Sequence, residues 1–103
     1  MNTIKHLCGA DLDEVIKSNK DLILFFYKEN DPTSILGCNT MNEVFELIGR
    51  PFDMYLIHAD SEPEILNAFS VESVPEYISV KNSRIYKRST DLLEVSEVLA
   101  LLK

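Results

Sequence analysis

The sequence predicts one α/β domain built around a mixed β-sheet, and two observations support this prediction. Apolar runs of strand length alternate with stretches whose apolar residues recur at helical spacing, which is typical of α/β domains. The elements follow the order β-α-β-α-β-α-β-β-α, so helices separate the first three strands, which we expect to be parallel. A tight turn joins the last two strands, which must be antiparallel. At 103 residues, without repeats or linkers, the chain is expected to form one domain, residues 1–103.

The first half of the domain begins with a weak strand over residues 3–7. The helix after it is expected to start at Asp11, with Glu14 as its capping-box partner, and to end near Asn19. Residues 22–27 (LILFFY) then form a continuous apolar run. A run of that length without polar alternation is typical of a central strand buried on both faces.

A second helix follows the polar turn at residues 28–32 and is expected to end at Gly49, because Pro51 comes two residues later. The spacing i, i+3, i+4, i+7 marks its buried face, which consists of Met41, Val44, Phe45 and Ile48. Residues 52–58 form the third strand.

The second half continues with a helix capped by Ser61 and Glu64. Residues 76–80 and 84–88 then form two strands joined by a hairpin turn at residues 81–83. For the last helix we expect Asp91 and Glu94 as the cap, with an inner face of Leu92, Val95, Val98, Leu99 and Leu102.

The charge of the chain excludes some classes of function. Seventeen acidic and ten basic residues give a net charge of −7, which would repel a phosphate backbone, so we expect no nucleic-acid role. No apolar run approaches the ~20 residues that cross a bilayer. The N-terminal segment lacks the apolar core of a signal peptide, so the expected location is cytoplasmic.

One basic run stands out in this acidic chain. Its members are Lys81, Arg84, Lys87 and Arg88. Such charges commonly protect an exposed edge strand from pairing, and the alternative is a patch for an acidic partner.

The two cysteines, Cys8 and Cys38, are too far apart in the sequence to form a CxxC motif. We expect both thiols to be reduced, and a disulfide between them is not expected. Together with His6 and His58 they do not make ligand-spaced pairs, so we expect no metal and no cofactor. Neither histidine has a serine or cysteine partner at motif spacing, so the sequence does not support a hydrolytic triad.

The segment from Phe52 to Arg84 resembles the thioredoxin pattern, in which a strand ends in aspartate, a short helix follows, and V-x-S-[VI]-P-T precedes a strand ending F-K-N-G. The matching positions are Asp60, Val71, Ser73, Val74, Pro75, Lys81 and Asn82. With LILFFYKEN and MNEVFELI, the resemblance covers nearly the whole chain. It implies a thioredoxin-like fold with a five-stranded mixed sheet of order 1-3-2-4-5 flanked by four helices. It also implies a cis peptide bond before Pro75.

The family's W-C-G-P-C motif is missing. An ungapped match places Asp31, Pro32, Thr33 and Ser34 over C-G-P-C, with Asn30 in the place of the tryptophan. Disulfide exchange requires a thiolate, and neither a carboxylate nor a hydroxyl can replace it.

Two supporting positions of the family pattern also differ. Phe25 matches its buried aspartate and Leu56 matches the lysine near it, which fits a site that no longer moves protons. Tyr77 is expected in the core or the groove wall.

The altered site has alternative interpretations. Asp31 and Ser34 either cap the helix or, with Thr33, offer polar recognition points beside Pro75. Cys38 is either a buried structural thiol or a reactive one. In a gapped alternative, residues 28–37 form a longer loop and Cys38 heads the helix, where its thiol would be activated.

These observations favour a non-catalytic module that binds a peptide or a partner protein, working as a monomer or a weak homodimer. The groove would be formed by the loop Ser73, Val74, Pro75 and Glu76. The alternative function is a thiol–disulfide oxidoreductase that uses the lone Cys38.

Overall fold

The computed structural model describes residues 3–18, 21–28, 31–47, 53–90 and 94–101. The strands are β1 (Thr3–His6), β2 (Leu22–Tyr27), β3 (Asp53–His58), β4 (Glu76–Lys81) and β5 (Arg84–Ser89). The helices are α1 (Leu12–Lys17), α2 (Pro32–Leu47), α3 (Pro63–Ala68) and α4 (Val95–Ala100), with a 3-10 turn, η1 (Gly9–Asp11), before α1.

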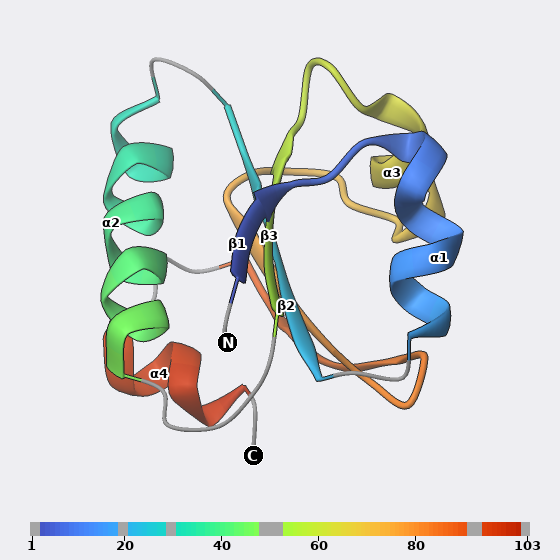
Figure 1. Cartoon of the computed structure of the whole chain (residues 1–103). Coiled ribbons are helices and arrows are strands. Elements are labelled where there is room, and N and C mark those ends of the chain that lie inside the picture. Colours follow the sequence, from blue (N-terminus) through green and yellow to red (C-terminus); the bar gives the residue numbers. More distant parts are fainter. Residues whose placement is uncertain (1–2, 19–20, 29–30, 48–52, 91–93, 102–103) are drawn as a thin grey trace.

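The strands form a mixed sheet of order β1-β3-β2-β4-β5. β1, β3 and β2 run parallel, whereas β4 is antiparallel to β2 and β5 is antiparallel to β4. Helices α2 and α4 cover one face of the sheet and α1 and α3 cover the other (Figure 1). The prediction of an α/β domain with a mixed sheet is confirmed.

The apolar run of β2 forms the centre of two cores, because successive side chains of a strand point to opposite faces. Ile23 and Phe25 face α2 and α4, while Leu22, Leu24 and Phe26 face α1 and α3. All five are buried, as the run without polar alternation predicts.

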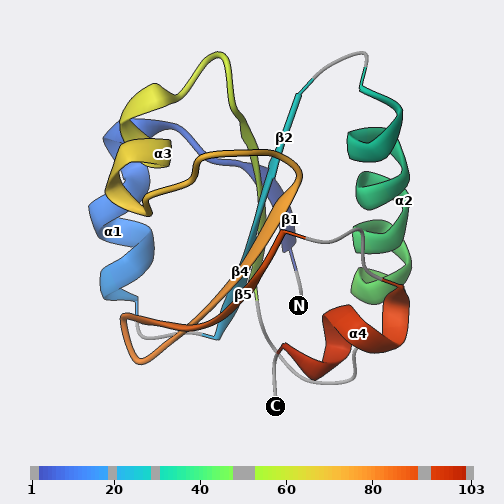
Figure 2. The same ribbon diagram turned by 180° about the vertical axis from the view of Figure 1, so that it is seen from behind.

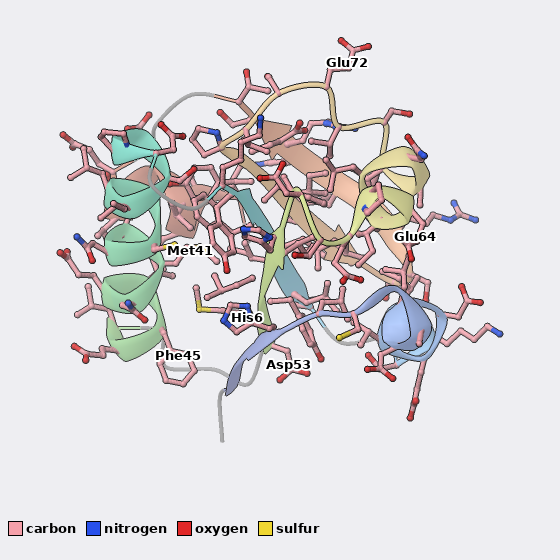
Figure 3. The ribbon with its side chains drawn as sticks, turned by 90° about the horizontal axis from the view of Figure 1, so that it is seen from above. His6, Met41, Phe45, Asp53, Glu64 and Glu72 are labelled. Atoms are coloured by element: carbon pink, nitrogen blue, oxygen red, sulfur yellow. The ribbon has the colours of Figure 1, made fainter. Side chains whose placement is uncertain are left out.

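The long helix α2 packs against the first of these cores through Met41 and Val44, which are both buried. Figure 3 shows Met41 projecting from α2 toward the sheet. The helical periodicity of the sequence therefore identifies the correct face of α2.

The predicted capping boxes of α1 and α3 are wrong. The Asp11 side chain makes no capping hydrogen bond, because the chain enters α1 from η1, whose Asp11 N–H donates to the Cys8 carbonyl at 3.0 Å. Glu62 precedes α3, also without a side-chain cap. The Ser61 hydroxyl lies instead 2.7 Å from Nδ1 of His58. In both cases a tight turn before the helix sets the backbone direction, so the capping side chain is not placed over the free N–H groups.

Several sequence predictions fall outside the described residues. These are the positions Asn19, Asn30, Ile48, Gly49, Pro51, Phe52, Asp91, Leu92 and Leu102. For the last helix, the predicted role of Glu94 as the capping-box partner is wrong, because Glu94 is itself the N-cap of α4. Its N–H donates to the carboxylate of Glu97, three residues later, at 3.1 Å.

Candidate functional site

The start of α2 carries the segment that the sequence predicts as an altered active-site loop. Pro32, Thr33 and Ser34 begin the helix and Asp31 precedes it. The Ser34 side chain is 1% exposed. Its hydroxyl accepts a hydrogen bond from the Lys28 N–H at 3.1 Å and donates one to Asp31 Oδ2 at 2.9 Å. The serine and aspartate therefore bind each other and tie the end of β2 to the start of α2.

The loop before β4 lies at the same end of the sheet. The Val74–Pro75 peptide bond is cis. Phe26 of β2 pairs with Glu76, so the loop lies beside the end of β2 that leads toward Asp31 (Figure 2). Ser73 is exposed, while Pro75 is buried. The two segments predicted to form the site thus approach each other through the β2–β4 pairing.

Glu76 has a role that the sequence does not reveal. Its carboxylate is buried, with a side chain 2% exposed, and it accepts a hydrogen bond from the Arg88 guanidinium of β5. This position carries threonine in the thioredoxin pattern described above. The hairpin register brings the two charges together, and pairing offsets part of the cost of burying the carboxylate.

The interior beneath the loop is apolar. Phe25 is fully buried, and its ring centroid lies 4.7 Å from that of the buried Tyr77. Leu56 packs against the same core. A Cβ on Gly37 would overlap Cζ of Phe25, so the phenyl ring occupies the space that any side chain at Gly37 would need.

The gapped alternative for the start of α2 is wrong, because the helix runs without a break from Pro32 through Gly37. Cys38 therefore lies in the second helical turn rather than at the helix start. The activation of a thiol by a helix N-terminus fades beyond the first turn.

The two thiols are both free, and their environments differ. Cys38 is half-buried and packs against the core between the sheet and α2. Burial raises the pKa of the Cys38 thiol above its ordinary value. Cys8 is exposed at the start of η1.

Sequence reasoning missed a polar aromatic cluster at the carboxyl ends of the parallel strands. The Tyr27 hydroxyl lies 3.4 Å from Nδ1 of His6, and the Tyr27 ring packs edge-on to His58 with centroids 5.4 Å apart. The search for histidine partners at motif spacing also missed Ser61, whose hydroxyl contacts His58. The available signal was that the three ring-bearing residues end neighbouring parallel strands.

This cluster lines a shallow pocket of about 340 Å³. Within the described ranges, no three His, Cys, Asp or Glu side chains are grouped so as to hold a metal ion. Within the same ranges, no helix is both long and apolar enough to span a bilayer.

Comparison with solved structures identifies the fold. A point mutant of a thioredoxin from Halobacterium salinarum superposes with a TM-score of 0.84 at 15% identity, covering 98% of this chain and 88% of that one. The reduced thioredoxin pre-protein of Schistosoma mansoni gives 0.85 at 14% identity, covering 99% and 96%. Trxlp from Edwardsiella tarda gives 0.82 at 16% identity, covering 96% and 97%.

Neither a family model nor a curated protein matches the chain. At 14–16% identity the structural matches establish the fold alone. The predicted thioredoxin-like fold is confirmed, and the chain is a thioredoxin-fold protein.

Proposed function

We propose that this chain is a non-catalytic thioredoxin-fold module that binds an extended peptide or a partner protein beside the loop of residues 73–76. In this proposal no dithiol exchange takes place, and the chain works as a monomer or a weak homodimer. The observation that carries the proposal is the environment of Ser34, because the hydroxyl is buried and both accepts and donates a hydrogen bond.

The chemistry of exchange supports this proposal. A disulfide opens when a thiolate attacks one of its sulfurs and the other sulfur leaves. Asp31 and Ser34 offer no sulfur, and their side chains are already hydrogen-bonded to each other. Cys38 is half-buried with a raised pKa, which lowers its thiolate fraction at neutral pH.

The surroundings of the missing dithiol support the same proposal. Phe25 and Leu56 are an apolar pair where the thioredoxin pattern has an acid and a base. Phe25 leaves no carboxylate that could move a proton under the loop. Ser73 in this loop is exposed, and an extended peptide can bind to the backbone of an exposed loop by strand addition.

Binding and turnover can be measured separately. An array of cysteine-free extended peptides probes binding without sulfur chemistry. Ser73→Arg should abolish binding of the peptides that wild type retains, because it places a long side chain over the loop. Asn67→Arg adds the same side chain at an exposed position of α3 and should leave binding unchanged.

Three results would contradict the proposal. The first is an array on which wild type binds no peptide, and the second is identical binding by Ser73→Arg and Asn67→Arg. The third is reduction of insulin disulfides with dithiothreitol as the electron donor, catalysed by wild type and lost in Cys38→Ser, which would establish an oxidoreductase.

A further inference from the structure

The β4–β5 hairpin differs in charge from the rest of the molecule. Residues 77–90 include four of the ten lysines and arginines and no aspartate or glutamate. The rest of the chain carries all seventeen acidic residues. A local positive field therefore lies on a molecule whose net charge is −7.

Three of these cations lie on one face of the hairpin. Tyr77 faces the core under α2 and α4, and alternation along β4 places Lys81 on that same face. The pairs Lys81–Arg84 and Ser79–Lys87 bring Arg84 and Lys87 to this face as well. Lys87 Nζ donates to the Ala100 carbonyl of α4 at 3.3 Å, which agrees with this placement.

An aromatic ring lies among these cations. The strand register shifts between Ser79 and Val80, which leaves Tyr86 as an extra residue in β5. Its ring lies 4.3 Å from Lys81 Nζ and 5.1 Å from Lys87 Nζ, and its side chain is 45% exposed. The exposed ring of Tyr86 therefore lies between two ammonium groups at the surface.

A shallow hollow of about 470 Å³ opens here, lined by Lys81, Asn82, Arg84, Ile85 and Tyr86. Among the described residues, no carboxylate lies within salt-bridge distance of Lys81 or Arg84. Arg88 differs from them, because it is paired with the buried Glu76. Lys81 and Arg84 are therefore charges that the described part of the fold does not neutralise.

From these observations we propose that the hairpin face formed by Lys81, Arg84, Tyr86 and Lys87 binds an acidic segment of a partner protein. Carboxylates of that segment pair with Arg84 and the two lysines, and its apolar atoms pack on the ring of Tyr86. A second copy of the hairpin would place like charges opposite each other. A long polyanion would meet the acidic remainder of the chain. This surface does not depend on the loop of residues 73–76.

Fluorescence anisotropy with a short labelled peptide of alternating glutamate and threonine tests the proposal. Wild type should bind it, and the glutamine version of the peptide should not bind. Arg84→Glu should weaken binding by about tenfold, since one attraction is replaced by one repulsion. Tyr86→Ala should also weaken it. Lys28→Glu makes the same change of charge at the other end of the sheet and should leave binding within about twofold of wild type.

Any of the following results of the anisotropy experiment would overturn the proposal. Equal loss of binding in Lys28→Glu and Arg84→Glu would mean that only the overall charge matters. Equal binding of the glutamine peptide, no binding at millimolar protein, or tighter binding of an oligothymidylate would exclude an acidic peptide as the ligand. Far-UV circular dichroism of Arg84→Glu must match wild type, and Tyr86→Ala serves as the second test if it does not.

Discussion

The start of α2 and the β4–β5 hairpin both carry polar side chains, but these side chains differ in burial and in hydrogen bonding. At the start of α2 the Ser34 hydroxyl is buried and engaged by Asp31 and by the Lys28 N–H. On the hairpin Lys81 and Arg84 have no carboxylate partner among the described residues.

The difference indicates which polar groups are structural and which are available to a ligand. A buried group that is already hydrogen-bonded stabilises the fold, and removing it costs stability. An exposed charge without a partner contributes little to stability and remains available for binding. Substitution of the buried, hydrogen-bonded Ser34 should therefore change the free energy of unfolding, and substitution of the exposed Arg84 should not.

The largest expected effect is at Gly37, in the helix. Gly37→Ala should lower the free energy of unfolding by about 2–3 kcal/mol, because its Cβ would overlap the Phe25 ring. Alanine gains only about 1 kcal/mol in helix propensity over glycine, which is not enough to offset this. Urea denaturation followed by circular dichroism measures the change.

A double-mutant cycle isolates the contact between Gly37 and Phe25. Phe25→Leu removes the ring atoms that a Cβ at Gly37 would meet, so the double variant should lose less stability than the sum of the two single variants. Strict additivity would contradict the account of α2 packing.

The second largest effect distinguishes two arginines of the hairpin, Arg88 and Arg84. Arg88→Ala should lower the free energy of unfolding by about 2 kcal/mol, because it leaves the buried Glu76 carboxylate without its charged partner. Arg84→Ala should change it by less than about 0.5 kcal/mol. Thermal unfolding of the two variants makes the comparison, and equal losses would show that Arg84 is structural as well.

A third and smaller effect is expected at Ser34. Ser34→Ala should cost about 1–2 kcal/mol, because the part-buried hydrogen bond from the Lys28 N–H loses its acceptor. Thr40→Ala is the matched control in the same helix, since its hydroxyl bonds only to the Leu36 carbonyl at the surface. Chemical denaturation of both variants should show a loss at Ser34 alone. If Ser34→Ala had the same free energy of unfolding as wild type, the hydrogen bonds of Ser34 would not contribute to stability.

The smallest expected effect concerns pH and the Cys38 thiol. Because burial raises the pKa of this thiol in the folded state, the folded protein holds the thiol proton more tightly than the unfolded chain does. Its contribution to stability is full below the unfolded pKa of about 8.5 and is lost as pH rises through the higher folded pKa. Iodoacetamide alkylates the thiolate, so in the Cys8→Ser background alkylation of Cys38 should be slow at neutral pH. It should become faster only when the pH approaches the raised pKa of Cys38. Fast alkylation at neutral pH would contradict the burial of Cys38.

Local patterns in the sequence predicted much of the fold. The run Leu22–Tyr27 predicted a doubly buried strand, and the spacing of Met41 and Val44 predicted the inner face of α2. Both predictions depend only on periodicity along the chain. The predicted position of Ser34 in the first turn of α2 also agrees with the structure.

Contacts between distant elements could not be predicted in the same way. Gly37 is a poor helix residue by propensity, and it is accommodated in α2 because Phe25 on a neighbouring strand fills the space of its side chain. The Glu76–Arg88 pair depends on the register of a hairpin that contains a bulge. Asp11 occupies the predicted N-cap position of α1, but its side chain makes no capping hydrogen bond, and Ser61 lies one residue before the N-cap of α3.

Insulin reduction by dithiothreitol, measured side by side for wild type and Cys38→Ser, tests most directly whether this thioredoxin fold has lost its redox chemistry. We expect both proteins to give the rate of dithiothreitol alone, because Asp31 and Ser34 carry no thiol and the Cys38 thiol stays protonated in the packed flank of α2. A faster rate with wild type that disappears in Cys38→Ser would contradict the account.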